Sequence, residues 1–372
     1  MQLKIAIIGS RGYPYIYSGY ETFVAELSQR LVNQNIEVSV YCHRTLFKNH
    51  PKIVNGIKLI YMPSLEYKIL SQFSHSLLAT IHALFRKYDL ILYVNSANGP
   101  FGLFTKLFRK KTLINVDGLE WLRPKWKGLG SKYFYWASKM AAKFFNVIIT
   151  DSHEMKKIFD KEFGVKSEMI AYGANIGFSK NHQLIRRWNL QKEGYYLIVG
   201  RLIPDNNVEL IVQEFTSSPS EKKLVVVGDV PYSDTYAQTI KSINDNRLVF
   251  TGYVYDQDNL AELYLNCFVY LHGHEYGGTN PTLLKALAYG NAIVALDTVF
   301  SREVLQNGEY GKFFSKKQDS LKNLIIRIEE HPDELIEFRK KSRQRIINHY
   351  TWEKITEQYI ELFNRVLNSR YN

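Results

Sequence analysis

Short β-branched runs alternate with longer amphipathic stretches along most of this chain, and the same rhythm starts twice. Such alternation is typical of βαβ units, in which strands enter a mainly parallel sheet and helices cover it. A polar, irregular stretch over residues 175–194 separates the two series. The 372 residues also exceed what one hydrophobic core usually supports, so the sequence predicts two α/β domains.

The limits of the predicted domains follow from where each series begins and ends. We expect a first domain over 1–180, a second over 190–350, and a terminal helix over 351–372 that can return to the first domain. Both domains should be Rossmann-like and doubly wound, facing one another across a cleft, because such sheets bind ligands at the carboxyl ends of their strands. The predicted strands cover 4–8, 37–41, 57–61, 90–94, 112–116 and 147–150, then 195–199, 223–227, 248–250, 268–271 and 292–296. The main predicted helices cover 21–32, 70–85, 132–145 and the tail from 333 to 367.

Charge and cysteine content limit the class of protein. A formal net charge of +12 and a pI near 9.3 indicate an anionic partner, which can be nucleic acid, an anionic membrane or a phosphorylated substrate. Cys42 and Cys267 lie far apart, which argues against a disulfide framework or a zinc site and favours the reducing cytoplasm. The apolar start resembles a first strand and not a signal peptide, and no window reaches the ~20 apolar residues of a membrane span. We expect a cytoplasmic protein that is soluble or at most peripheral.

Glycines mark the turn after the first predicted strand. Gly9 and Gly12 end that strand, and Ser18, Gly19 and Glu21 precede the first helix. Glycines here let backbone N–H groups approach a ligand, and a helix N-terminus favours an anion. The alternative is the tight first turn of any Rossmann-like domain, because the G-x-G-x-x-G and Walker A patterns are both absent.

The second domain offers two further anion-binding features. Arg201 directly follows a predicted strand, where it can clamp a diphosphate through bidentate hydrogen bonds or else lie as a solvated surface side chain. The segment from Gly277 to Asn280 precedes a helix and supplies backbone donors and small side chains. His272, His274 and Glu275 could be taken for metal ligands, but three polar residues on one loop more often make ordinary loop contacts.

Two groups of motifs resemble a known family. VGRLIPDNN, followed by HGHEYGGTNPTLLKALAYGNAIVA, resembles the donor-binding half of family-four glycosyltransferases of the GT-B fold. IIGSRGYPYIYSGYETFVAELSQRL and NVDGLEWLRPKW resemble the first domain of a subgroup that includes bacterial polysaccharide rhamnosyltransferases. The resemblance implies sugar transfer from a nucleotide donor with retention of configuration, and no metal or cofactor.

The resemblance also implies a donor site. Arg201 would bind the diphosphate, the 277–280 loop would hold the sugar and pyrophosphate, and Glu21 would lie behind the first-domain glycines. The donor-binding set expected in this way consists of Gly9, Gly12, Gly19, Arg201, Asn206, Glu275, Gly277, Gly278, Thr279, Asn280 and Lys285.

The chain departs from the family pattern at two places. Asn206 stands where the family usually has a Lys, which removes a positive charge. The family's paired glutamates would align with Gly277 and Lys285, with Glu275 near the first position but out of register. An ammonium can donate to a ribose hydroxyl but cannot accept from it. The preference for the nucleotide should therefore differ from that of the family.

Carboxylates for the reaction are predicted after a first-domain strand. Asp117 and Glu120 are the candidates for contacting an acceptor hydroxyl or stabilising an oxocarbenium-like transition state. Asp117 can equally be a turn residue before Gly118. Glu120 is expected to orient neighbouring groups.

A basic and aromatic band runs over residues 125–145, and Lys106, Arg109, Lys110 and Lys111 add to its charge. Such a band can lie on an anionic membrane, or it can be a solvated face above residues that pack on the sheet.

The sequence thus predicts a transferase that moves L-rhamnose from dTDP-rhamnose, or a sugar from a UDP donor, to a lipid-linked or polysaccharide acceptor. A nucleotide-sugar epimerase of similar fold and a degenerate, non-catalytic transferase remain alternatives. A nucleic-acid-binding protein would also explain the charge. However, no helix-turn-helix, RNP or finger pattern supports that class, so no nucleic acid partner is expected.

Overall fold

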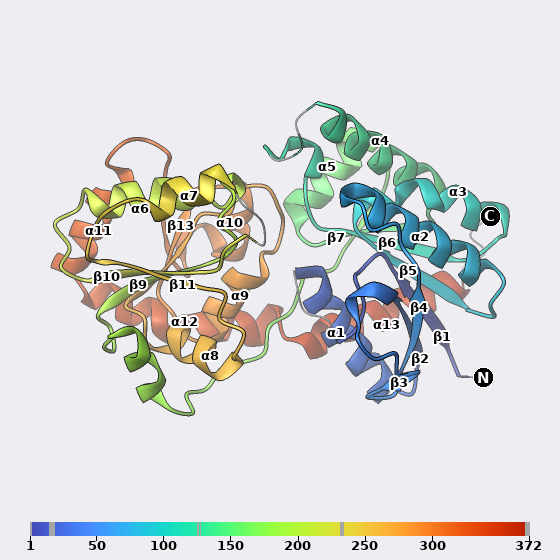
Figure 1. The fold of residues 1–372 in the computed structure, drawn as a ribbon, viewed down its shortest axis with the longest axis horizontal. Coiled ribbons are helices and arrows are strands. Elements are labelled where there is room, and N and C mark those ends of the chain that lie inside the picture. The colour runs from blue at the N-terminus through green and yellow to red at the C-terminus, as the bar shows by residue number, and fades with distance from the viewer. Residues whose placement is uncertain (1, 15–18, 125, 127, 231–233, 369–372) are drawn as a thin grey trace. The chain divides into compact units, whose positions relative to one another are not determined.

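The computed structural model describes residues 2–14, 19–124, 126, 128–230 and 234–368, and divides the chain into two compact units. Unit 1 comprises residues 1–173 and 352–372, and unit 2 comprises residues 174–351. Both are parallel-sheet α/β domains of the Rossmann type, which confirms the predicted fold class at this level (Figure 1). Residues 174–180, grouped with the first domain by the sequence, lie in unit 2, and the terminal helix lies in unit 1.

Unit 1 contains an eight-stranded sheet in the order β3-β4-β2-β1-β5-β6-β7-β8, parallel except for the β3–β4 pair. Its central strands are continuous apolar runs, as expected for strands that are covered on both faces; every residue of β5 is buried. The strands are β1 (Lys4–Ile8), β2 (Glu37–His43), β3 (Ile53–Val54), β4 (Ile57–Met62), β5 (Leu90–Val94), β6 (Thr112–Val116), β7 (Val147–Thr150) and β8 (Glu168–Met169).

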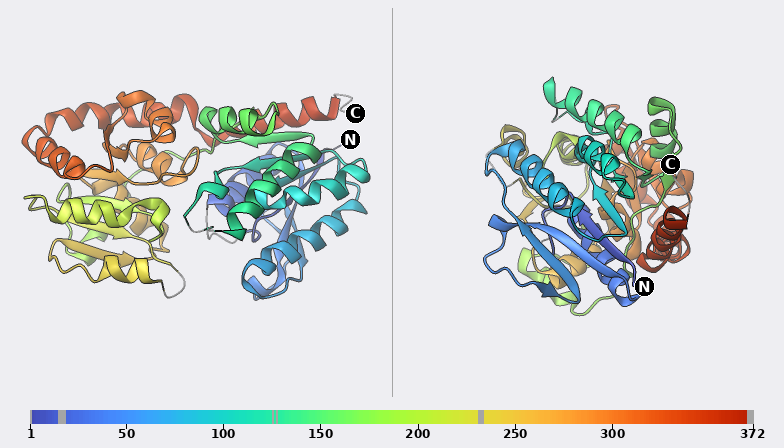
Figure 2. Two further views of the ribbon diagram at one scale, coloured as in Figure 1. Left: turned by 90° about the horizontal axis from the view of Figure 1, so that it is seen from above. Right: turned by 90° about the vertical axis from the view of Figure 1, so that its right-hand side faces the viewer.

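The helices of unit 1 form two layers. Helices α2, α3 and α4 lie on one side of the sheet, and α1 and α13 pack together on the other (Figures 1 and 2). Local signals set their ends: α5, for example, begins after Ser152, whose side chain accepts from Met155 N, and ends at Gly164 in the left-handed conformation. The helices are α1 (Gly19–Asn33), α2 (Lys68–Leu84), α3 (Gly102–Leu107), α4 (Leu129–Phe144), α5 (His153–Phe163) and α13 (Trp352–Asn368).

Unit 2 contains a six-stranded parallel sheet in the order β11-β10-β9-β12-β13-β14. Its strands are β9 (Tyr195–Val199), β10 (Lys223–Val227), β11 (Leu248–Gly252), β12 (Val269–His272), β13 (Ile293–Leu296) and β14 (Lys312–Phe314). Its helices are α6 (Val208–Thr216), α7 (Thr235–Lys241), α8 (Gln257–Asn266), α9 (Pro281–Ala288), α10 (Val299–Val304), α11 (Ser320–Glu330) and α12 (Asp333–His349). The tail from 333 to 367, expected to be helical, consists of two helices, because α12 and α13 are separated at Tyr350 and Thr351 and belong to different units.

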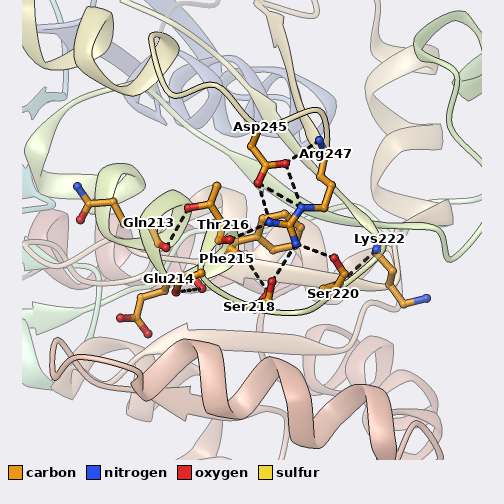
Figure 3. A network of polar contacts seen from close by, with 10 residues as sticks. Gln213, Glu214, Phe215, Thr216, Ser218, Ser220, Lys222, Asp245 and Arg247 are labelled. Carbon is orange, nitrogen blue, oxygen red and sulfur yellow. Dashed lines mark hydrogen bonds and ion pairs between the residues drawn. The ribbon is translucent and has the colours of Figure 1, made fainter.

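A network around Arg247 closes the end of α6 in unit 2 (Figure 3). The Arg247 guanidinium donates to the carbonyl oxygens of Thr216, Ser218 and Ser220 and pairs with Asp245 at 2.6 Å. Carbonyl oxygens at a helix C-terminus lack hydrogen-bond donors within the helix, and a guanidinium placed there supplies these donors. The network joins the end of α6 to the start of β11.

None of the helices in the described ranges is both long and apolar enough to cross a bilayer.

Candidate functional site

Two glycines bring the loops at the carboxyl edge of the unit 2 sheet into direct backbone contact. A Cβ atom at Gly228 would lie 2.1 Å from the Gly200 carbonyl oxygen, and one at Gly273 would lie 2.2 Å from that of Asn206. Because these distances exclude any side chain, glycine is required after β10 and β12. The loops after β9, β10 and β12 therefore form one surface.

Arg201 lies on this surface with its side chain half-exposed. Within the described ranges no residue forms a hydrogen bond or ion pair with its guanidinium. Its backbone is held, since Asn206 Nδ2 donates to the Arg201 carbonyl oxygen at 2.8 Å. The result is a cation at a strand end with a fixed backbone and a free side chain, which suits bidentate binding of a diphosphate.

Asn206 joins two of these loops. Besides the bond to Arg201, its Oδ1 atom lies 2.8 Å from His274 Nδ1. A Lys at this position would add a positive charge but could not accept from an imidazole N–H. The residue that replaces the family's Lys therefore shapes the site through loop contacts.

The predicted 277–280 loop enters helix α9. Gly277, Gly278 and Thr279 are buried, and Asn280 caps the helix by accepting from Thr282 N at 2.9 Å. The Oδ1 atom of Asn280 is thus engaged by the helix, which fixes the end of this loop at the start of α9.

Glu275 is held by neighbouring side chains. Its Oε2 atom pairs with Lys316 at 2.6 Å and accepts from Asn207 Nδ2 at 3.3 Å. His272, before it, is buried, and burial lowers its pKa to about 3. Across the parts of the chain that the structure describes, no three His, Cys, Asp or Glu residues are placed to hold a metal ion.

Lys285 contacts aromatic rings on the α8 side of α9. Its Nζ atom lies 5.8 Å from the Tyr264 ring centroid, 5.9 Å from that of Tyr289 and 3.3 Å from Gln257 Oε1. Both rings can stabilise the ammonium through cation–π contact. The Lys285 ammonium is therefore stabilised by two aromatic rings and one amide oxygen.

In unit 1, the glycines of the first turn are required by packing. Gly9 has φ +109°, and a Cβ there would lie 2.4 Å from the Val94 carbonyl oxygen. Gly12 has φ +123°, and a Cβ there would lie 2.8 Å from Cys42 Sγ. Glu21 is buried behind the turn and accepts from Arg11 N at 3.0 Å. Gly19 is the first residue of α1, whereas Ser18 lies outside the described residues.

Asp117 and Glu120 lie together after β6. Arg123 Nε is 3.0 Å from Glu120 Oε1, and Trp126 donates to Glu120 Oε2 at 2.7 Å. Asp117 Oδ2 accepts from Tyr172 at 3.0 Å, and burial raises the pKa of this carboxyl while Arg123 lowers it. Asp117 is half-buried, whereas Glu120 is buried. Asp117 is therefore the carboxylate that solvent reaches more easily.

Sequence reasoning missed the residues that support Asp117. Tyr172 follows β8, and Tyr359 on α13 accepts from Asn115 Nδ2 at 2.8 Å. The rings of Tyr172 and Tyr359 both pack on Phe23. These partners come from distant segments, and only Asn115, inside the NVDGLEW motif, carried a local signal.

Comparisons with known proteins divide the chain in the same way. Residues 17–175 match the family model described as Glycosyltransferase Family 4, and residues 181–348 match Glycosyl transferases group 1. A curated relative, a probable sucrose-phosphate synthase of Thermosipho melanesiensis, is 22% identical over 180 residues. That match covers 45% of this chain and only 41% of the relative.

Solved structures share the fold over nearly the full length. Sucrose-phosphate synthase from Thermosynechococcus elongatus has a TM-score of 0.82 at 19% identity, covering 98% of this chain and 99% of that one. Anabaena HepE in complex with UDP and glucose has a TM-score of 0.78 at 16% identity, covering 98% and 100%. A glycosyltransferase from Rickettsia africae has a TM-score of 0.78 at 15% identity, covering 99% of both chains. Together with the two family matches, the fold makes this chain a glycosyltransferase of the GT-B type.

Proposed function

We propose that this GT-B glycosyltransferase transfers a hexosyl group from a nucleoside-diphosphate donor to an acceptor hydroxyl. The observation that carries the proposal is the half-exposed Arg201 guanidinium, held at a strand end with no partner among the described residues. As the glycosidic bond breaks, negative charge develops on the leaving diphosphate. A cation at this position stabilises that charge more in the transition state than in the bound donor.

The backbone of the 277–280 loop is proposed to complete the donor site. Gly277 and Gly278, buried before the capped N-terminus of α9, carry backbone N–H groups of the kind that can donate to an anion. In unit 1, we assign Asp117 to the acceptor hydroxyl and Glu120 to positioning the surrounding loop through Arg123 and Trp126.

For the donor we propose dTDP-L-rhamnose, with a UDP-hexose as the second candidate. The first rests on the NVDGLEW and GGTNP motifs together with Lys285, because a dTDP donor lacks the ribose 2′-hydroxyl that a Glu would accept from. The second is favoured by HepE, which was solved with UDP-glucose. A lipid-linked or polysaccharide acceptor completes the proposal.

A panel of nucleotide sugars, with release of nucleoside diphosphate as the readout, tests the function. We expect turnover with dTDP-rhamnose above that with UDP-glucose. Turnover with UDP-glucose alone would replace the first donor by the second. Nucleotide binding without turnover of any donor or acceptor would identify a non-catalytic transferase domain.

Lys285→Glu tests the basis of the donor preference. The new carboxylate can accept from a ribose 2′-hydroxyl, and an unpaired polar group costs about 1 to 3 kcal/mol, so UDP affinity should rise about fivefold to a hundredfold relative to dTDP. Lys285→Met is the matched control, because it removes the ammonium from Tyr264 and Tyr289 without adding an acceptor. If Lys285→Glu instead weakens UDP binding, Lys285 contacts the nucleotide directly and the argument for dTDP is wrong.

A further inference from the structure

Helix α2 turns its apolar side chains toward solvent. Exposure ranges from 38% to 74% for Leu70, Phe73, Leu78, Ile81 and Phe85, which follows the helix directly. Their spacing places them on one face of the helix. This face has no partner within the described parts of unit 1 that would remove it from water.

The opposite face of α2 is buried although most of its residues are small or polar, with Leu84 at 6% exposure as the large apolar exception. His75, Ser76, Ala79, Thr80 and Ala83 are completely inaccessible to solvent. In a helix on the surface of a water-soluble domain the apolar stripe normally faces the core. α2 has the opposite orientation, with its apolar stripe facing away from the core. Such a stripe is stabilised by an apolar environment outside the domain.

Helix α3 repeats this reversal. It buries Gly102 and Thr105. Three large apolar side chains on it, and a fourth directly after it, are exposed to between 39% and 70%: Leu103, Phe104 and Leu107, then Phe108. Gly102 is required there, because a Cβ would lie 2.5 Å from the Phe145 ring. The close approach of α3 to the domain is thus made through its small residues.

The two exposed stripes join into one surface, here called the α2–α3 face. The rings of Phe85 and Phe108 meet edge to face with centroids 5.7 Å apart. Helices α2 and α3 lie side by side on the same side of the sheet (Figures 1 and 2). A continuous apolar surface of this size on one domain is typical of a binding site for a protein or a membrane.

The segment that forms the α2–α3 face and α4 is rich in positive charge. Residues 67–150 contain thirteen Lys or Arg and only three Asp or Glu. On neighbouring α4, Lys132, Trp136, Lys139 and Lys143 are exposed and recur at helical spacing. Lys106 donates to the Lys143 carbonyl oxygen at 3.3 Å, which ties the end of α3 to this stripe. Lys125 and Lys127, which the sequence placed in the same band, lie outside the described residues.

We propose that the α2–α3 face and the α4 stripe dock the protein on an anionic lipid surface. Phe and Leu side chains enter the boundary between headgroups and acyl chains, while the lysines contact the headgroups. A second copy of the chain would bring like charges together and is disfavoured. The proposal deepens the proposed function, since it brings the protein to the membrane where a lipid-linked acceptor resides.

The test measures binding of the full chain to vesicles, which requires no donor and so is independent of transfer activity. We expect binding to phosphatidylcholine vesicles that contain phosphatidylglycerol and much weaker binding to pure phosphatidylcholine. Phe85→Gln/Leu107→Gln should reduce binding at least about tenfold through lost apolar burial. Lys132→Gln/Lys139→Gln should reduce it about tenfold and weaken its salt dependence. Leu78→Gln/Leu103→Gln provides a second apolar variant if the first does not fold.

Matched controls come from unit 2. Ile336→Gln/Ile347→Gln removes two aliphatic side chains that are each 45% exposed on α12, and Lys192→Gln/Lys317→Gln removes two exposed charges. Both controls should bind vesicles like the wild type. Equal binding to neutral vesicles, or wild-type binding by both apolar variants, would overturn the proposal. A lipid-free dimer that Phe85→Gln/Leu107→Gln dissociates would also overturn it and assign the face to a second copy.

Discussion

The carboxyl edges of the two sheets differ in what their charged side chains contact. In unit 1, Glu120 is buried against Arg123 and Trp126, and Asp117 accepts from Tyr172. In unit 2, Arg201 is half-exposed, and no described residue pairs with its guanidinium. A buried pair has partners that depend on one another for stability, whereas an unpaired cation at a strand end is available to a ligand. The charged side chains of unit 1 therefore stabilise the carboxyl edge of its sheet. In unit 2, the charge of Arg201 is available to a ligand.

The largest expected effect is on the stability of unit 1. Arg123→Met leaves the Glu120 carboxylate buried without its cation, so unit 1 should lose about 3 to 5 kcal/mol of unfolding free energy. Arg201→Met should change the stability of unit 2 by no more than about 0.5 kcal/mol. Hydrogen exchange of peptides from each unit measures both effects. Glu120→Gln/Arg123→Met should recover part of the loss, and equal losses for the two Arg variants would remove the distinction between the edges.

Acid should also destabilise unit 1 more than unit 2. His43 and His75 stack with ring centroids 3.8 Å apart, and burial lowers their pKa values to about 4 and about 3, whereas unit 2 has the similarly buried His272. Below the ordinary His pKa of about 6.5, the unfolded chain takes up protons that the folded protein does not, so stability falls as the pH falls. At pH 5 each buried His should cost about 2 kcal/mol.

Unfolding at pH 7 and pH 5, followed by hydrogen exchange, measures this difference. The loss should be about twice as large in unit 1, and His75→Asn should reduce its pH dependence. An equal loss in the two units would contradict the assignment of neutral, buried imidazoles to His43 and His75.

Donor use should depend on Arg201. Charge-assisted hydrogen bonds contribute about 1.5 to 3 kcal/mol, so Arg201→Ala should lower kcat/KM for the donor about tenfold to a hundredfold with unchanged stability. Arg327→Ala is the control, since this exposed Arg on α11 pairs with Glu334. Unchanged donor kinetics in Arg201→Ala would show that the Arg201 guanidinium does not bind the donor diphosphate.

The smallest expected effect on stability concerns the hydrogen bond between α13 and strand β6, which leads to Asp117. Tyr359→Phe removes the hydroxyl that accepts from Asn115, which should cost about 1 kcal/mol and increase exchange in β6. Tyr135→Phe is the control, because its hydroxyl donates to Glu162 at the surface. If β6 exchanges at the same rate in both variants, α13 does not support the strand that leads to Asp117.

The secondary structure could be predicted where many residues repeat one pattern. β5 and β6 were placed correctly, β5 from an uninterrupted apolar run and β6 from a short β-branched one, and both strands are buried along their whole length. The two-residue strands β3 and β8 and the three-residue β14 were missed, because so few residues carry no periodicity. Neither Pro nor Gly marks the break between α12 and α13, although the sequence placed the start of a separate terminal helix at 351.

In the candidate site, too, local sequence could predict the position of some residues, whereas the contacts of others depend on the tertiary structure. Arg201 and the glycines beside it follow strands directly, so their place at the carboxyl edge could be inferred from neighbouring residues. Glu275 and Asn206 were assigned to the donor, but their contacts with Lys316 and His274 come from loops that meet only in three dimensions. The same holds for Lys285, whose aromatic partner Tyr264 belongs to the preceding helix.

Periodicity is a property of adjacent residues, and it was enough to predict two parallel-sheet domains, while the resemblance of the motifs to family-four glycosyltransferases implied the GT-B type. Which side of a helix meets the core is a different matter, because α2 and α3 follow the usual spacing yet bury mainly small or polar side chains and expose most of their large apolar ones. The aromatic support of Asp117 likewise joins β6 to a helix more than two hundred residues later. Such pairings form when distant segments compete for the same buried space, and no local pattern records the outcome.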